Sequence, residues 1–382
     1  MKGVSILGVT GSIGTSALAV LRQHPERFRL VAMTAARNRE GLEAAARDWS
    51  PQLAVLSHAA VQEGHRDGTE WRTGSEALIE AATHPDVDIV INAVVGAAGL
   101  APTLAALRAG KRVALANKET LVCGGPLVLS AMREGGGELI PVDSEHSAIM
   151  QCIHGYGIET VERIVLTASG GPFRDVPKEA LARMSPADAL RHPTWSMGAK
   201  VTIDSATLAN KALEVIETHF LFGVEYDRIA AVVHPQSIIH SLIDFVDGST
   251  LAQMGFPTME IPILNALSYP ERLPYQVRRF DPVSAGSLTF EALRDDAFPA
   301  FRLGVEAGRR GGTYPAVFNA ANEVAVAAFL NHQLGFPGIA ETIDATLQLW
   351  RADSLDGLSA VTEADQRARE LAETFIRNKS QC

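Results

Sequence analysis

The sequence predicts an α/β protein with a parallel sheet near its N-terminus, a central α+β part and a helical C-terminal part. Three patterns support this prediction. Apolar runs alternate with helical patterns up to about residue 143, which is typical of a parallel sheet covered by helices. Between residues 229 and 255 strand patterns follow one another directly, and from Glu291 onward helical periodicity dominates, with Ala320-Ala321-Asn322-Glu323 inside a small-residue helix.

Length and composition limit the classes of protein to consider. A chain of 382 residues is too long for a single core. Its net charge of -10 argues against a nucleic-acid binder, and no apolar run reaches the length of a membrane span. The chain runs from Met1 straight into its first apolar segment, and its three cysteines have no metal-type spacing. We therefore expect a cytoplasmic protein without nucleic-acid or membrane partners.

The first apolar run, residues 4–9, is followed at once by a glycine-rich turn and a helical pattern. Strand, glycine turn and helix form the first unit of a Rossmann-like dinucleotide fold, in which a pyrophosphate approaches the helix N-terminus. Gly8, Gly11 and Gly14 follow GxxGxxG rather than the commoner GxGxxG. An ordinary turn between strand and helix is the alternative.

The end of the second predicted strand, residues 29–34, bears on the choice of cofactor. A chain that binds NAD usually has an acid there to hold the ribose 2′-hydroxyl. Here the sequence is Ala35-Ala36-Arg37-Asn38-Arg39, so no acid repels a 2′-phosphate and two arginines can neutralise one. Taken alone, these could be surface arginines at a helix start. Together with the glycine turn they favour NADP(H).

Two later strands end in charged residues. The strand predicted at residues 112–116 leads into Asn117-Lys118-Glu119, where Lys118 and Glu119 also suit an ion pair at a helix start. The next strand leads into Asp143-Ser144-Glu145. On extended backbone these two acids point the same way, and the alternative is a solvated strand end with Ser144 as a cap. Because function gathers at strand carboxyl ends, we expect Lys118 and the acid pair to line one crevice.

Residues 169–199 form a proline-broken segment that is hinged at Ser169-Gly170-Gly171. It has room for a short helix at residues 178–184 and ends in His192-Pro193-Thr194-Trp195-Ser196-Met197-Gly198. Such a segment suits a lid that excludes water when a substrate binds. An irregular surface loop is the alternative, but it does not account for a Trp and a Met at the tip.

A helix is expected after Val201, capped by Asp204 or Ser205. Asn210, Lys211 and Glu214 share one face of it. A hydroxyl, an amide and an ammonium near a helix start suit a phosphate, although Lys211 and Glu214 also suit a surface ion pair.

Asp143, Glu145 and Glu214 offer oxygen ligands without cysteine, which suits Mg²⁺ or Mn²⁺ rather than zinc. Such a cation would offset the repulsion between the acids and polarise substrate oxygens. No nucleophile elbow surrounds Ser144, so a serine hydrolase is a poor alternative. The residues thus predict an enzyme that uses NADPH and a divalent metal and acts on a small phosphorylated hydroxy-ketone.

Several motifs, read in order, resemble the 1-deoxy-D-xylulose 5-phosphate reductoisomerase family. The resemblance runs from residue 4 to about residue 325 and is carried by residues 8–14, 117–119, 143–146, 169–173, 192–198, 210–214 and 234–237. It implies conversion of 1-deoxy-D-xylulose 5-phosphate to 2-C-methyl-D-erythritol 4-phosphate in non-mevalonate isoprenoid biosynthesis. The implied course is retro-aldol cleavage and re-aldolisation, followed by hydride transfer from NADPH. The resemblance also implies a homodimer.

The resemblance assigns roles residue by residue. The implied metal ligands are Asp143, Glu145 and Glu214, which form the implied catalytic set together with Lys118. The implied substrate contacts are Lys118, Ser144, Glu145, Ser169, His192, Trp195, Met197, Ser205, Asn210, Lys211 and Glu214. The implied NADPH contacts are Thr10, Gly11, Ser12, Ile13, Ala36, Arg37, Asn38, Asn117, Glu119 and Gly198. Ala36 departs from the family, which commonly has glycine there.

The expected domains are an NADPH-binding domain (residues 1–143), a domain of catalysis and dimerisation (144–268), a linker (269–290) and a helical domain (291–382). Two other function classes remain open. A simple NADPH-dependent reductase of another phosphorylated aldehyde or ketone would not need three acids around a metal. A non-catalytic NADP(H)-sensing protein would need neither a lid nor a metal.

Overall fold

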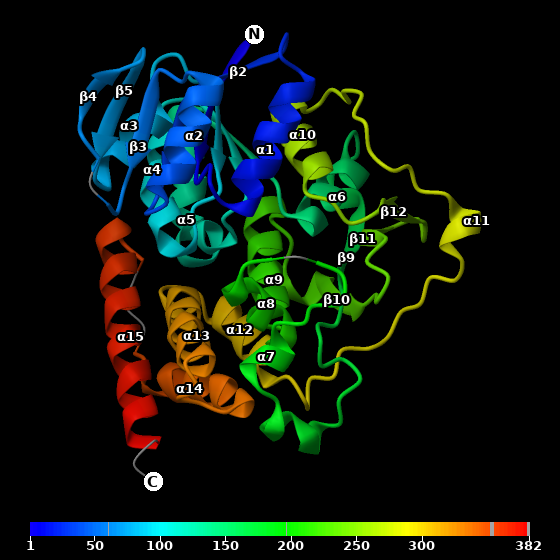
Figure 1. Ribbon diagram of the computed structural model, residues 1–382. Coiled ribbons are helices and arrows are strands. Elements are labelled where there is room, and N and C mark those ends of the chain that lie inside the picture. Colours follow the sequence, from blue (N-terminus) through cyan, green and yellow to red (C-terminus); the bar gives the residue numbers. More distant parts are fainter. Residues whose placement is uncertain (60, 196, 352–354, 380–382) are drawn as a thin grey trace. The chain divides into compact units, whose positions relative to one another are not determined.

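A computed structural model describes residues 1–59, 61–195, 197–351 and 355–379 (Figure 1). The chain divides into two compact units that alternate along the sequence. Unit 1 comprises Met1–Thr120, Pro126–Ser147 and Thr258–Val277, and unit 2 comprises Leu121–Gly125, Ala148–Pro257 and Arg278–Cys382. Within the described ranges, no helix is both long enough and apolar enough to cross a membrane.

Unit 1 is built on an eight-stranded sheet with the order β4-β5-β3-β2-β1-β6-β7-β8. All its pairings are parallel except β4 with β5, which confirms the predicted parallel sheet. The order reverses between β1 and β6, and ligands of open α/β sheets bind at such a switch point. The strands are β1 (Lys2–Leu7), β2 (Phe28–Ala35), β3 (Leu53–Leu56), β4 (Gly64–Arg66), β5 (Thr69–Thr73), β6 (Ile89–Asn92), β7 (Arg112–Leu115) and β8 (Glu138–Pro141).

Strands β3 and β6 are buried at every residue, which indicates that both faces of this sheet are covered, as is typical of a parallel sheet flanked by helices. Helix α3 packs beside α4, and α1 packs beside α10 (Figure 1). These helices are α1 (Ser12–Gln23), α2 (Arg39–Trp49), α3 (Glu76–Thr83), η1 (Gly96–Gly99), α4 (Leu100–Arg108), α5 (Lys118–Gly135), α6 (Ser144–Ile153) and α10 (Glu260–Ser268). Residues of α5 and α6 are shared between the two units.

Unit 2 contains a four-stranded mixed sheet with the order β10-β9-β11-β12. Its strands are β9 (Val161–Ala168), β10 (Ile229–Val233), β11 (Ile239–Phe245) and β12 (Thr250–Met254). The antiparallel pairing of β11 with β12 confirms the predicted hairpin. The prediction of one strand over residues 229–245 is wrong, because the chain turns before β11, where Ser237 has a φ of +50°. Strands β10 and β11 therefore lie on opposite sides of β9.

Helices make up the rest of unit 2, and the predicted C-terminal helical region is confirmed (orange to red in Figure 1). Helix α13 packs against α8, α9, α14 and α15, and its Phe318 and Phe329 lie in the core. The helices are η2 (Ile158–Thr160), η3 (Lys178–Arg183), α7 (Pro186–Ala189), α8 (Ala199–Thr207), α9 (Ala209–Phe222), η4 (Tyr226–Arg228), α11 (Pro282–Ala285), α12 (Pro299–Arg310), α13 (Tyr314–Leu330), α14 (Phe336–Leu349) and α15 (Leu358–Lys379).

Candidate active site

The turn between β1 and α1 depends on its glycines. Gly8 has a φ of +90°, which glycine adopts without strain. A Cβ on Gly14 would lie 2.4 Å from the carbonyl oxygen of Gly8, so only glycine lets α1 start this close to the turn. Gly11 is the exposed N-cap of α1. The predicted cofactor residues Thr10, Gly11, Ser12 and Ile13 therefore lie together at a helix N-terminus, which suits a pyrophosphate.

The second group of predicted cofactor residues follows β2. Ala36, Arg37 and Asn38 are all exposed. The Asn38 side chain accepts a hydrogen bond from the N–H of Gly41 at 3.0 Å and caps α2. Ala36 is not among the residues that have a positive φ in the described ranges, so alanine fits this backbone without strain.

Asn117 holds the loops after β6 and β7 together. Its amide donates to the carbonyl oxygens of Val94 at 2.5 Å and Gly96 at 2.9 Å. Its side-chain oxygen accepts from the N–H of Thr120 at 2.9 Å, which caps α5. Glu119 lies 3.3 Å from the same amide, and both side chains are buried. These two predicted cofactor residues thus shape the edge of the sheet beside the switch point.

Asp143 and Glu145 lie where a strand passes into a helix. The prediction that both acids project from extended backbone is wrong, because β8 ends at Pro141 and α6 begins at Ser144. The N–H of Ser144 donates to Asp143 Oδ1 at 3.0 Å, and its hydroxyl donates to the Glu145 carboxylate. The Lys118 ammonium forms an ion pair with Asp143. Unit 1 thus brings Lys118 and both acids to one edge of the sheet.

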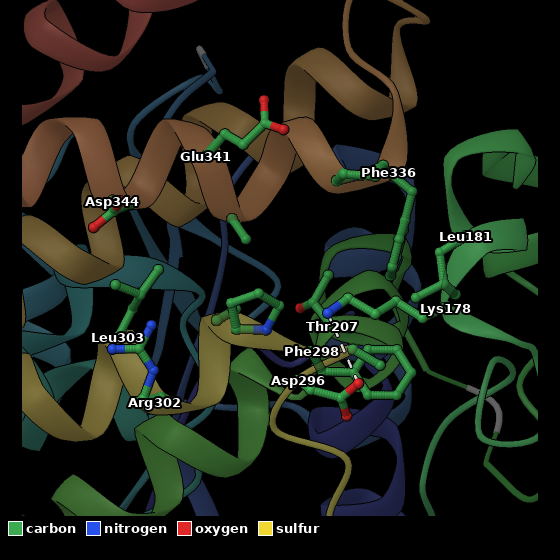
Figure 2. Close-up of a pocket in the computed structure, with 15 residues that line it drawn as sticks. Lys178, Leu181, Thr207, Asp296, Phe298, Arg302, Leu303, Phe336, Glu341 and Asp344 are labelled. Carbon is green, nitrogen blue, oxygen red and sulfur yellow. Dashed lines mark ion pairs between the residues drawn. The ribbon is translucent and has the colours of Figure 1, made fainter.

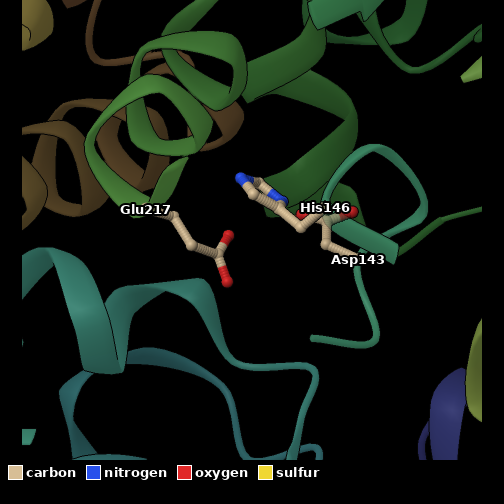
Figure 3. Close-up of side chains that lie close together, drawn as sticks. All are labelled: Asp143, His146 and Glu217. Carbon is tan, nitrogen blue, oxygen red and sulfur yellow. The ribbon is translucent and has the colours of Figure 1, made fainter. Parts of the chain in front are cut away.

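Sequence reasoning gave no role to two buried residues near the predicted ligands in the chain. His146 lies in the first turn of α6 after Asp143, and Glu217 lies on α9, three residues after Glu214 (Figure 3). Both are 0% exposed. The sequence held a partial signal for Glu217, because this acid directly follows the apolar residues Val215 and Ile216 of α9. Buried ionisable groups are common at functional sites.

A cluster in unit 2 consists of Ser169, His192 and Ser205, and we call it the serine–histidine cluster. His192 Nε2 lies 3.0 Å from Ser169 Oγ and 3.1 Å from Ser205 Oγ. Ser169 follows β9, His192 follows α7, and Ser205 lies in α8. Three predicted phosphate contacts from separate elements thus converge on one point.

The hydrogen bonds of His192 define its protonation state. Its Nδ1 accepts the backbone N–H groups of Thr194 at 3.2 Å and Trp195 at 2.9 Å, so this nitrogen carries no proton. The proton of the ring is therefore on Nε2, between the two serine hydroxyls. Burial lowers the pKa of His192 below its ordinary value of 6.5, so the ring is neutral at pH 7. The cluster offers three neutral donors to an anion.

Helix α9 carries three of the predicted residues on one face. Lys211 forms an ion pair with Glu214 and donates to the carbonyl oxygen of Thr167 at 2.5 Å, and Asn210 donates to Glu214. Lys211 is 4% exposed and Glu214 is 1% exposed. The pair is therefore buried and is not the surface ion pair that the sequence left open.

The start of the predicted helix after Val201 is wrong. Helix α8 begins at Ala199 with Gly198 as its N-cap, and Asp204 is buried in its interior. Leu208, with a φ of +62°, ends α8 and is followed directly by α9. This turn places Asn210 and Lys211 in the first turn of a new helix, where an anion is favoured.

The tip of the predicted lid is linked to the serine–histidine cluster through the N–H of Trp195, which donates to His192. Trp195 and Met197 are half-buried, whereas Gly198 is exposed. Ser196 lies outside the described residues.

Unit 2 also contains a cavity of about 310 Å³ (Figure 2). Leu181, Phe298, Leu303 and Phe336 provide much of its apolar lining, and Lys178 and Asp296, which form an ion pair at 3.8 Å, also line it. Among the described residues that line it, none is a predicted site residue. An apolar cavity of this kind does not suit a phosphorylated hydroxy-ketone.

Family models match most of the chain. A model described as 1-deoxy-D-xylulose 5-phosphate reductoisomerase matches residues 4–125, and one described as its C-terminal domain matches residues 139–222. A third, described as the DXP reductoisomerase C-terminal domain, matches residues 254–371.

Relatives and solved structures agree with these matches. A protein named 1-deoxy-D-xylulose 5-phosphate reductoisomerase from Chlorobium phaeovibrioides is 49% identical over 382 residues, which cover 98% of this chain and 100% of the relative. The structure of the enzyme of that name from Zymomonas mobilis in complex with NADPH has a TM-score of 0.91 and 41% identity, covering 98% and 99% of the two chains. A structure of DOX-P reductoisomerase in complex with NADPH, fosmidomycin and magnesium has a TM-score of 0.92 and 38% identity, covering 100% of both.

Proposed function

The chain belongs to the 1-deoxy-D-xylulose 5-phosphate reductoisomerase family, and from this we propose that it converts 1-deoxy-D-xylulose 5-phosphate to 2-C-methyl-D-erythritol 4-phosphate. It is an NADPH-dependent oxidoreductase that uses a divalent metal and acts in non-mevalonate isoprenoid biosynthesis. The observation that carries the proposal is the serine–histidine cluster, because its three converging donors suit the phosphate of this substrate.

The phosphate is bound by residues of unit 2. Ser169, His192 and Ser205 donate to its oxygens, and Asn210 and Lys211 add an amide and an ammonium from the first turn of α9. The neutral Nε2–H of His192 donates without bringing a second buried positive charge beside Lys211. Trp195 and Met197 cover the carbon backbone when residues 169–199 close as a lid.

The divalent cation is held by Asp143, Glu145 and Glu214. Their donor set fits Mg²⁺ or Mn²⁺, since all three ligands are carboxylate oxygens. The ion pairs of Asp143 with Lys118 and of Glu214 with Lys211 favour the charged carboxylates that a metal requires. When bound, the metal polarises the substrate carbonyl and NADPH supplies the hydride. Lys118 and Ser144 contact the polar end of the substrate.

NADPH is held along the switch point of unit 1. Gly11 and Ser12, with their neighbours Thr10 and Ile13, present the N-terminus of α1 to the pyrophosphate. Arg37 neutralises the 2′-phosphate, with Ala36 and Asn38 beside it. The remaining proposed contacts are Asn117, Glu119 and Gly198.

The test is NADPH oxidation with 1-deoxy-D-xylulose 5-phosphate, measured with and without Mg²⁺ or Mn²⁺. We expect metal-dependent turnover that falls at least a hundredfold in Glu214→Gln. The control Glu225→Gln makes the same charge change at an exposed residue and should keep wild-type turnover. Full activity of Glu214→Gln would remove Glu214 from the metal site. Undiminished reduction of a preformed phosphorylated aldehyde in EDTA would favour the simple reductase.

A homodimer, a cytoplasmic location and the division into three domains and a linker complete the proposal. Strand β12 supports the homodimer, because it is the edge strand of the unit 2 sheet and carries exposed Leu251 and Met254. Light scattering should give twice the mass of the chain, and Leu251→Lys should shift it toward the monomer. A wild-type monomer at micromolar concentration would contradict this part of the proposal.

A further inference from the structure

A buried polar contact joins α8 to α13, and it involves none of the predicted site residues. The Asn322 amide donates to Asp204 Oδ1 at 2.8 Å, and the Lys200 ammonium lies 2.8 Å from Asp204 Oδ2. Asp204 is 1% exposed and Asn322 is 0% exposed. Asn322 belongs to the Ala-Ala-Asn-Glu stretch of the C-terminal region, which the sequence analysis left without a role.

Burial of the Asp204 carboxylate costs folding free energy unless the carboxylate keeps its hydrogen-bonding partners. Asp204 is 1% exposed, so its carboxylate is held in the protein interior away from water. A buried carboxylate is destabilising unless it is paired and hydrogen-bonded. Rotating α8 by one residue would turn Asp204 away from Asn322 and lose this hydrogen bond, whereas Lys200 lies on α8 and would move with Asp204.

The residue after Asp204 is Ser205, whose position depends on this rotation. Ser205 Oγ lies 3.1 Å from His192 Nε2 in the serine–histidine cluster. We propose that Asp204 and Asn322 are positioning residues for phosphate recognition: they hold α8 at the rotation at which Ser205 faces His192 and the phosphate of the substrate. This inference rests on the proposed function, and it assigns a part in substrate binding to the C-terminal helical region.

The first test compares two asparagines of α13. Asn322→Ala removes the contact with α8, whereas Asn319→Ala removes an equally buried amide that bonds Glu323 of its own helix at 3.0 Å. For Asn322→Ala we expect KM for 1-deoxy-D-xylulose 5-phosphate and the inhibition constant of inorganic phosphate to rise together about tenfold. Its kcat and its KM for NADPH should stay within threefold of wild type. Asn319→Ala should leave all four constants within twofold.

The second test is rescue by exchange. Asn322→Asp places two carboxylates face to face and should raise both phosphate-dependent constants at least as much as Asn322→Ala. Adding Asp204→Asn restores an amide opposite a carboxylate and should recover at least threefold of the loss. An Asn322→Ala protein that melts lower but binds substrate and phosphate like wild type would overturn the inference. So would the absence of any recovery in the exchanged pair.

Calorimetry with inorganic phosphate separates this inference from the proposed function. If wild type does not turn over 1-deoxy-D-xylulose 5-phosphate but binds phosphate more tightly than Asn322→Ala does, the function fails and the positioning role stands. If wild type turns over the substrate and Asn322→Ala binds phosphate equally well, the positioning role fails and the function stands.

Discussion

Gly171 is where the chain leaving β9 meets α8, and replacing it with alanine tests how the serine–histidine cluster is assembled. Its φ is +68°, and a Cβ would lie 2.7 Å from the carbonyl oxygen of Ser205. The left-handed conformation costs an alanine about 1–2 kcal/mol. Overpacking against fixed backbone adds about 1–3 kcal/mol. A less flexible unfolded chain offsets about 0.4–1 kcal/mol of this.

Gly223 provides the matched control. Its φ is +64°, and a Cβ there would meet nothing within 4 Å. Gly223→Ala therefore has the same conformational cost as Gly171→Ala but lacks the packing cost against α8. The difference in stability between the two variants should equal the packing cost, about 1–3 kcal/mol. For a unit the size of unit 2 that corresponds to a melting temperature lower by about 2–12 °C.

The assay combines thermal unfolding with steady-state kinetics. Relief of the contact with Ser205 requires α8 or the residues after β9 to move, which separates Ser205 from Ser169 and His192. We expect Gly171→Ala to raise KM for 1-deoxy-D-xylulose 5-phosphate about tenfold and to leave KM for NADPH unchanged. Gly223→Ala should leave both constants unchanged. Equal melting temperatures for the two variants, with an unchanged KM for the phosphorylated substrate, would refute the reasoning.

Three other predictions concern separate parts of the molecule. Gly14→Ala should weaken NADPH binding at least tenfold by calorimetry, because the new Cβ would displace the β1–α1 turn; unchanged affinity would mean that the turn does not contact the cofactor. The pKa of His192 is lower in the folded protein than in the unfolded chain. As the pH falls below 6.5 the unfolded chain therefore takes up the proton first, and the stability that the neutral ring contributes to the fold is lost; above pH 6.5 this contribution is fully present. The drop in melting temperature between pH 7.5 and 5.5 should be smaller in His192→Asn than in wild type, and equal drops would contradict this. Lys211→Met should cost about 3–5 kcal/mol of unfolding free energy because it leaves Glu214 charged and buried, and adding Glu214→Gln should recover part of that loss.

The parallel sheet could be predicted because its signal is local and repeated. Each buried strand is a short apolar run bounded by turn residues, and each helix supplies its own period. The hairpin of β4 and β5 gives a weaker signal, because β4 is exposed throughout and has no apolar run. Asp67-Gly68 was the missed indication, since both residues have positive φ in the turn and Asp-Gly favours that conformation.

The residue types of the site could be predicted, but their assembly could not. A serine after a strand, a histidine among prolines and a serine in a helix carry no mark in the sequence that they meet. Their meeting depends on tertiary packing, such as that of Gly171 on the Ser205 backbone. Burial of the Lys211–Glu214 pair depends on packing in the same way, because its spacing on a helix suits an exposed pair equally well.

The corner between α8 and α9 carries no sequence signal of a helix end. Glycine or asparagine usually occupies the left-handed position at a helix C-terminus, whereas this corner has Leu208 at a φ of +62°. The strain costs about 1–2 kcal/mol. Leu208 is 4% exposed in the core of unit 2, and removing a buried leucine side chain costs about 2–5 kcal/mol. Packing therefore outweighs backbone strain here, so a leucine is retained at the turn from which the phosphate-binding helix α9 begins.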